Sequence, residues 1–262
     1  MPALSLEAAE VSHDPYPHLV SFPALPDPEY RRFKDAVPPV EAFDLKGNGS
    51  KLELDIVEKG PAFTTLPADR QNVLLELRQT LRDTALGLAA IFGDALQEKY
   101  EWLLGQELTR EALADGWTTT NGRVMGRAPG YKLDPHLDSA QQGMTCLLYL
   151  TDAPTPEDGA LGLYRPVRPL EVLTASTYYP KAEGVETVLV KTIPVRENKF
   201  VAFVSGPRSL HGFGRDSAKA QGWRFVYQCH VIPKRLKMDA LMPKLPEEQR
   251  RRWQKYMGTA TM

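Results

Sequence analysis

The chain has 262 residues, a length that accommodates one large domain or two small ones, and we expect a single domain over 1–262. Hydrophobic residues make up 42% of the sequence and charged residues 25%, which is ordinary for a soluble globular protein. The net charge of −1 provides no overall basic field that would attract nucleic acid, and no apolar run is long enough to cross a bilayer. We therefore expect neither a nucleic-acid partner nor a membrane partner.

The N-terminus and the cysteines predict a cytoplasmic protein. Residues 1–7 lack the basic start and apolar stretch of a secretory signal. Cys146 and Cys229 both lie in apolar, strand-like runs, as structural core thiols do in a reducing compartment.

Residues 1–115 are expected to form a mostly helical support region. A turn and a short strand fall within 14–22, Asp27 and Pro28 begin a helix, and 52–56 alternates like an edge strand. From 67 to 104 apolar residues recur every three or four positions, and Gly87 and Gly93 divide this stretch into two or three helices. These helices are predicted to brace a sheet.

Residues 116–233 change to a period of two and are expected to form a mainly-β core. Strands are predicted at 118–127, 145–150, 161–164, 185–193, 199–204 and 223–232. Many short strands without intervening helices favour a sandwich or barrel over a parallel sheet. Residues 234–262 are predicted to form a helical tail that packs through Trp253 and Tyr256, with the basic run 250–252 exposed to solvent.

Three residues suggest a metal site. His136 and Asp138 are two positions apart, so in an extended segment both side chains project from the same face. His211, about seventy residues on, is the candidate for a third ligand. Two histidines and one carboxylate form the facial triad of non-haem Fe(II) oxygenases, which leaves the opposite face of the metal open. Taken alone, the His-x-Asp pair could equally be a surface turn with a hydrogen-bonded carboxylate.

Five segments place this triad in a wider pattern: Gly130-Tyr131 with His136-Leu137-Asp138, then 145–150, 159–164, His211-Gly212 and 224–227. In this order they resemble the Fe(II)/2-oxoglutarate-dependent dioxygenases, and most closely the prolyl-hydroxylase-like branch. The resemblance covers roughly 118–233. It implies an α+β protein with a mainly-β core, a double-stranded β-helix (jelly roll) braced by N-terminal helices and a C-terminal helix.

The resemblance also implies roles for individual residues. His136, Asp138 and His211 would hold Fe(II), with 2-oxoglutarate and O2 as cosubstrates. Arg224 would form a salt bridge to the C5 carboxylate of 2-oxoglutarate, and the Tyr149 phenol would donate to the same carboxylate. An arginine suits this role because its planar guanidinium offers two parallel donors.

The sequence departs from the family pattern in two places. Gly159-Ala160 replaces a Gly-Gly pair, and Val226 replaces a small hydroxyl residue two positions after Arg224. The ligand Asp138 is retained, which argues against the halogenating relatives that replace it.

Further residues are predicted from their positions. Gln228 shares a strand face with Arg224 and is expected to meet substrate or cosubstrate. Arg127 and Tyr131 precede the metal motif and are expected to contact substrate, with Arg127 binding an anionic group. His230 is expected to be a core or rim residue.

These observations predict a hydroxylase that acts on a small molecule, such as an amino acid, natural-product or saccharide intermediate, and releases succinate and CO2. Alternatives are a prolyl-hydroxylase-like enzyme acting on a peptide or protein, a cupin-type metalloenzyme that does not use 2-oxoglutarate, and a jelly-roll binding module without metal. The substrate, the reaction outcome and the oligomeric state stay open at this point.

Overall fold

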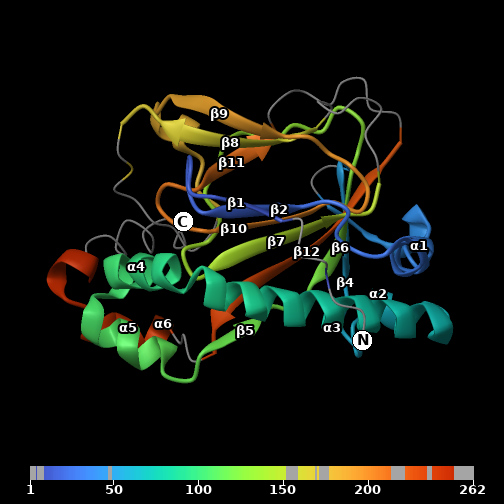
Figure 1. Ribbon diagram of the computed structural model, residues 1–262, viewed down its shortest axis with the longest axis horizontal. Coiled ribbons are helices and arrows are strands. Elements are labelled where there is room, and N and C mark those ends of the chain that lie inside the picture. Colours follow the sequence, from blue (N-terminus) through green and yellow to red (C-terminus); the bar gives the residue numbers. More distant parts are fainter. Residues whose placement is uncertain are drawn as a thin grey trace.

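A computed structural model describes residues 4, 9–46, 49–151, 159–168, 170, 177–213, 222–234 and 238–250. Within these residues, two antiparallel sheets face each other (Figure 1). The large sheet has the order β1-β2-β10-β7-β12-β6-β4-β3, with β5 also paired to β12, and the small sheet has the order β11-β8-β9. The strands of the large sheet are β1 (Glu10–Ser12), β2 (His18–Ser21), β3 (Asp44–Lys46), β4 (Lys51–Asp55), β5 (Trp117–Thr119), β6 (Arg123–Arg127), β7 (Met144–Tyr149), β10 (Phe200–Val204) and β12 (Arg224–Pro233). The small sheet consists of β8 (Leu161–Pro166), β9 (Thr187–Ile193) and β11 (Leu210–Phe213).

The order in which the chain visits the two sheets is that of a double-stranded β-helix. After β6 and β7 in the large sheet, the chain crosses to β8 and β9, returns to β10, crosses again to β11 and returns to β12. An isolated bridge between His136 and His211 places the segment between β6 and β7 beside β11, where it extends the small sheet. The predicted jelly-roll core is confirmed.

Apolar side chains of the central strands alternate between the two faces of the large sheet, so a hydrophobic core forms on each face. Leu147 on β7 and Phe203 on β10 face the small sheet, whereas Cys146 and Leu148 pack on the other face with the apolar side of a long helix. A fully buried leucine side chain stabilises the fold by roughly 1.5–3 kcal/mol. Because β7 is buried on both faces, it is a rigid support for the side chains that it points between the sheets.

Helices cover the outer face of the large sheet (Figure 1). They are α1 (Asp27–Asp35), α2 (Pro61–Thr64), α3 (Ala68–Ile91), α4 (Gly93–Leu104), α5 (Gln106–Leu113) and α6 (Met238–Leu241), with 3-10 turns at Val40–Ala42, Pro180–Glu183 and Met242–Lys244. The break predicted at Gly93 is confirmed. The break predicted at Gly87 is wrong, because Gly87 lies inside α3, where the buried stripe that includes Leu81 and Leu88 keeps the helix continuous across it. None of the helices in the described part of the chain is long and apolar enough to span a membrane.

Three strand predictions need correction. The stretch 118–127 is two strands, since Gly122 turns the chain at φ +66° and a Cβ there would lie 1.9 Å from the Tyr227 hydroxyl oxygen. Strand β4 is not at the sheet edge, because β3 pairs on its outer side. His211 lies within a strand, β11, that the sequence pattern does not predict. Trp253 and Tyr256 of the predicted tail lie outside the described residues, which end at Arg250.

Candidate metal centre and cosubstrate pocket

The three predicted metal ligands come together between the sheets. The backbones of His136 and His211 exchange two hydrogen bonds, His136 N to His211 O at 2.9 Å and His211 N to His136 O at 3.0 Å. This pairing places the two imidazole rings side by side, with centroids 4.2 Å apart. Asp138 completes the group, because its Oδ1 lies 3.8 Å from His136 Nε2 and 3.6 Å from His211 Nε2. The donor atoms all lie within 4.8 Å of one another, which is the spacing of ligands around one ion.

Hydrogen bonds orient both imidazoles for metal binding. Nδ1 of His136 lies 3.0 Å from the carbonyl oxygen of Asp134, and Nδ1 of His211 lies 3.1 Å from that of Ser209. A carbonyl oxygen can only accept, so we assign the proton of each ring to Nδ1, which leaves the Nε2 lone pairs directed at the common point. Burial, and then the charge of His211, lowers the pKa of His136 to about 4, so this ring is neutral at pH 7.

The carboxylate of Asp138 is held ionised. Burial raises the pKa of Asp138, but the charges of His211, His230 and His136 and a hydrogen bond from Thr145 together bring it to about 2. Two imidazole nitrogens and one carboxylate on one side of an open space form a ligand set that suits a divalent ion such as Fe(II).

A hydroxyl behind the candidate metal site orients Asp138. Thr145 Oγ1 donates to Asp138 Oδ2 at 2.5 Å, and it lies 3.0 Å from Ser205 Oγ and 3.1 Å from His230 Nδ1. Since its only proton goes to Asp138, the Thr145 oxygen accepts from these two neighbours. The result is a carboxylate with one oxygen fixed and the other, Oδ1, facing the histidines. His230 is a buried core residue in this chain of contacts, with its pKa lowered to about 4 mainly by burial.

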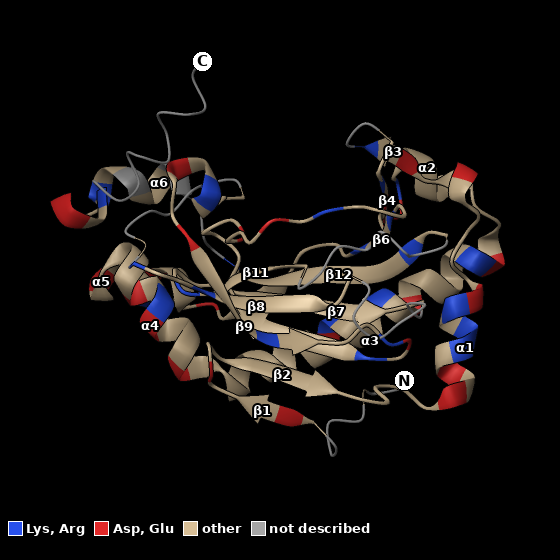
Figure 2. Cartoon of the chain, turned by 90° about the horizontal axis from the view of Figure 1, so that it is seen from above, with Lys and Arg blue, Asp and Glu red and all other residues tan. Residues whose placement is uncertain are grey.

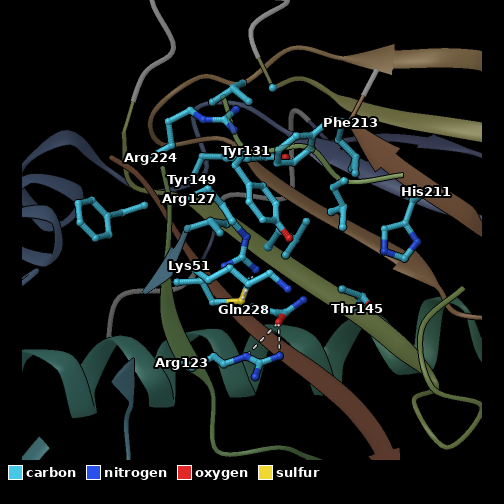
Figure 3. A pocket seen from close by; sticks show the side chains of 18 of the residues that line it. Lys51, Arg123, Arg127, Tyr131, Thr145, Tyr149, His211, Phe213, Arg224 and Gln228 are labelled. Carbon is cyan, nitrogen blue, oxygen red and sulfur yellow. Dashed lines mark hydrogen bonds between the residues drawn. The ribbon is translucent and has the colours of Figure 1, made fainter. Parts of the chain in front are cut away.

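A cavity of about 290 Å³ opens beside the triad, and the inward faces of β4, β6, β12 and β7 line it (Figure 3). Strand register arranges its side chains in rows across the sheet. One row runs Lys51, Arg127, Arg224; the next runs Glu53, Met125, Val226, Tyr149; and a third runs Arg123, Gln228, Leu147. The prediction that Gln228 shares the inward face with Arg224 agrees with this register.

Arg224 is fixed in the wall of the cavity. The residue is 8% exposed, and the centre of its guanidinium lies 4.8 Å from the centroid of the Phe213 ring. Gly159 packs against it so closely that a Cβ there would lie 1.2 Å from Arg224 Nη1. Gly159 also has φ +63°, a conformation that favours glycine, so this position of the Gly-Ala pair is the one that the site requires.

Tyr149 lies opposite Val226 in the register, in the row adjacent to that of Arg224. Burial raises the pKa of the Tyr149 phenol above its ordinary value, and the charge of Arg224 offsets only part of this rise. The phenol therefore stays protonated at neutral pH and can donate a hydrogen bond into the cavity. Figure 3 shows Tyr149 and Arg224 at the same end of the pocket, with His211 at the other end.

Gln228 has a partner of its own. Its Oε1 accepts from Arg123 Nε at 3.2 Å and from Arg123 Nη2 at 2.9 Å, and Arg123 also lies 3.6 Å from Glu53. Gln228 therefore faces the cavity through an amide that is already held in place.

The cavity lining also contains three residues that were not predicted from the sequence: Thr145, Arg123 and Lys51. For Thr145, the one available signal is a hydroxyl at an inward position of an apolar strand.

Comparison with known proteins gives matches in structure alone. No protein-family model matches the chain, and no curated protein matches it by sequence. Among solved structures, it is similar to HygX from Streptomyces hygroscopicus with nickel and 2-oxoglutarate bound, with 14% identity, a TM-score of 0.46 and 83% of each chain covered. It is also similar to a prolyl hydroxylase from Trichoplax adhaerens, solved with a hypoxia inducible factor peptide fragment, with 11% identity, a TM-score of 0.45 and 83% of this chain and 84% of that chain covered.

A third structure is a Pseudomonas putida prolyl-4-hydroxylase, with 16% identity, a TM-score of 0.38 and 83% of this chain and 92% of that chain covered. With TM-scores below 0.5, these likenesses leave the function to be inferred from the chain's own residues.

Proposed function

We propose that this chain is a mononuclear Fe(II)- and 2-oxoglutarate-dependent oxygenase that hydroxylates a C–H bond of a small molecule. The observation that supports the proposal best is the shared cavity: His136, Asp138 and His211 lie at one end and Arg224 lies at the other. A metal alone would need the triad and an open face. A buried arginine at the far end fits a cosubstrate that binds the metal with one end and carries a carboxylate at the other.

In the proposed enzyme, the residues that line the cavity would have three roles: they would bind the metal, bind 2-oxoglutarate and exclude water. His136, Asp138 and His211 would hold the ion on one face, with Thr145 fixing the rotation of the Asp138 carboxylate. Arg224 and Tyr149 would bind the C5 carboxylate of 2-oxoglutarate, the first through its two-donor fork and the second through its phenol. Leu147, like its apolar neighbours in the lining, would exclude water from the reacting atoms.

Bound Fe(II) would supply the activation of O2, so that substrate R–H, 2-oxoglutarate and O2 give R–OH, succinate and CO2. One oxygen atom of O2 enters the product and the other enters succinate. The cavity of about 290 Å³ also has to accept the cosubstrate, which favours a small substrate or a single inserted side chain.

Succinate formation tests the proposal. The purified chain is incubated with Fe(II), 2-oxoglutarate and air, and succinate is quantified by mass spectrometry. We expect slow, Fe(II)-dependent succinate formation by the parent and none by His211→Ala. The matched control is His13→Ala, since His13 is an exposed histidine outside the cavity. A parent that binds metal at the triad, yet neither binds 2-oxoglutarate nor forms succinate, would favour a cupin-type metalloenzyme instead.

A further inference from the structure

We infer that the substrate carries an anionic group, a carboxylate or a phosphate monoester, which binds between Lys51 and Arg127. The inference rests on the proposed oxygenase function, because it assigns to the substrate the part of the cavity that the metal and 2-oxoglutarate would not occupy.

Three cations form one row across three neighbouring strands. Lys51 on β4 lies directly opposite Arg127 on β6, and Arg127 lies directly opposite Arg224 on β12. Side chains at opposite positions have Cβ atoms only about 4.5–5.5 Å apart, and like charges placed there destabilise a sheet. In the proposed function, the cosubstrate carboxylate neutralises Arg224 alone. Lys51 and Arg127 stay as two adjacent positive charges in the wall of the same cavity.

A fourth cation in the lining, Arg123, differs from this pair because its charge is balanced within the protein. Arg123, four residues before Arg127 on β6, lies 3.6 Å from Glu53 and donates twice to Gln228. By contrast, neither Lys51 nor Arg127 forms an ion pair with a carboxylate among the residues that the structure describes. Arg127 instead donates from Nη1 to the Gly126 carbonyl at 3.1 Å and from Nη2 to Met125 Sδ at 3.2 Å.

An aromatic ring holds both cations at the cavity wall. Lys51 Nζ lies 5.6 Å and the centre of the Arg127 guanidinium 5.2 Å from the centroid of the Tyr131 ring. Tyr131 in turn packs edge-on against Phe213, at 5.6 Å between ring centroids. Each terminal nitrogen of Arg127 carries a second N–H besides the one that it donates to the Gly126 carbonyl or to Met125 Sδ. Together with the neighbouring Lys51 ammonium, these N–H groups can present several donors to one anionic group. Figure 3 shows both side chains next to Tyr131, on the side of the pocket away from His211.

The position of the pair separates it from the cosubstrate site but keeps it within reach of a small substrate. Neighbouring strands are about 4.8 Å apart, so β6 and β4 lie roughly 5 and 10 Å to the side of the Arg224 strand. Tyr179 lines the same cavity, with its ring centroid 5.4 Å from that of His136. A molecule anchored by its anionic end at Lys51 and Arg127 would place carbon atoms several bonds away beside the metal centre.

The location inside a cavity argues for a small anion over a polyanion. On the outer helices that Figure 2 labels, basic and acidic residues are interspersed, which does not suit a nucleic-acid backbone. Lys51 and Arg127 instead line the same cavity as the triad.

The test measures anion binding to the protein loaded with Mn(II) and saturating 2-oxoglutarate, after unbound metal has been removed. Inorganic phosphate and acetate are titrated by calorimetry at an ionic strength held constant with chloride. We expect at least one of them to bind the parent, and Arg127→Gln and Lys51→Gln each to weaken that binding roughly tenfold or more. Tighter binding of phosphate would identify a phosphate monoester, and tighter binding of acetate a carboxylate. Arg127→Lys should recover part of the affinity, because it restores the charge without the fork.

Arg31→Gln is the matched control, since Arg31 is an exposed arginine on α1 that pairs with Asp27 at 2.8 Å. Equal anion binding by the parent and both pocket variants would overturn the inference, and so would no binding beyond that of chloride. If the two variants lose affinity for 2-oxoglutarate instead, the pair belongs to the cosubstrate site and the inference is wrong. A parent that does not bind 2-oxoglutarate at all is recognised in the loading step, and it refutes the proposed function itself.

Discussion

Replacement of Arg224 by methionine should weaken 2-oxoglutarate binding by about two orders of magnitude. Methionine is unbranched, so it can fill much of the space over Phe213 while removing the charge and the donors. Arg224 is 8% exposed, so a carboxylate that binds it is largely withdrawn from water. Loss of one partner from such a buried, hydrogen-bonded charge pair costs about 2–5 kcal/mol, which corresponds to a roughly 30- to several-thousand-fold increase in Kd. Because Tyr149 still donates, we expect a value toward the lower end.

The assay is calorimetric titration of 2-oxoglutarate into the Mn(II)-loaded protein without oxygen. Arg224→Lys separates charge from shape: it keeps the positive charge but loses the two-donor fork, and it should bind about tenfold more weakly than the parent. Arg165→Met is the matched control, because the Arg165 side chain is 56% exposed and pairs with Asp14 on the surface. A Kd for Arg224→Met within about threefold of the parent's, with a large loss in Arg127→Met instead, would show that the anchor has been assigned to the wrong arginine.

Three further outcomes follow from the site and its support. Thr145→Val keeps the side-chain shape but removes the hydroxyl that orients Asp138, so metal affinity measured by competition with a chelator should fall about 10- to 100-fold. Gly159→Ala should abolish most 2-oxoglutarate binding by displacing the cosubstrate arginine, whereas Gly184→Ala, at a similar φ of +67° but with open space around it, should leave that binding unchanged. Burial lowers the pKa of Lys99 from 10.5 to about 7. Between these two pH values Lys99 is protonated in the unfolded chain but largely deprotonated in the folded chain, so the free energy of unfolding rises with pH across that window. Lys99→Met removes this burial penalty together with the hydrogen bond that Lys99 Nζ donates to the Gln142 carbonyl. Chemical denaturation should show the stability of the variant relative to the parent falling steadily from pH 7 towards pH 10.

The sequence was most informative where chemistry demands particular residue types at short spacing. His136 and Asp138 could be recognised as a pair from the strand period, His211 was the candidate for a third ligand, and the resemblance supported all three. The reason that these residues meet is a backbone bridge between His136 and His211, segments about seventy residues apart, and no local pattern encodes that bridge. The strand that carries His211 was missed for the same reason, since its few residues show no clear alternation.

Residues that reach the site by long-range register could not be predicted. Lys51 looks like a surface residue of an edge strand until the pairing of β4 with β6 places it opposite Arg127. Thr145 is hidden in a buried apolar strand, where only the direction of the side chain shows that it touches Asp138. At Gly87, local propensity predicted a helix break that the structure does not have. Packing of the surrounding leucines against the sheet outweighs the roughly 1 kcal/mol cost of a glycine inside a helix.

The most direct test of the account is an anaerobic titration of 2-oxoglutarate into the Fe(II)-reconstituted protein, followed by visible absorption. If the triad and Arg224 bind the two ends of one cosubstrate, a charge-transfer band should grow to saturation in the parent and should be absent in His211→Ala at the same protein and iron concentrations. Stoichiometric iron in the parent with no band, and no calorimetric evidence of 2-oxoglutarate binding, would contradict the assignment of the cavity to this cosubstrate.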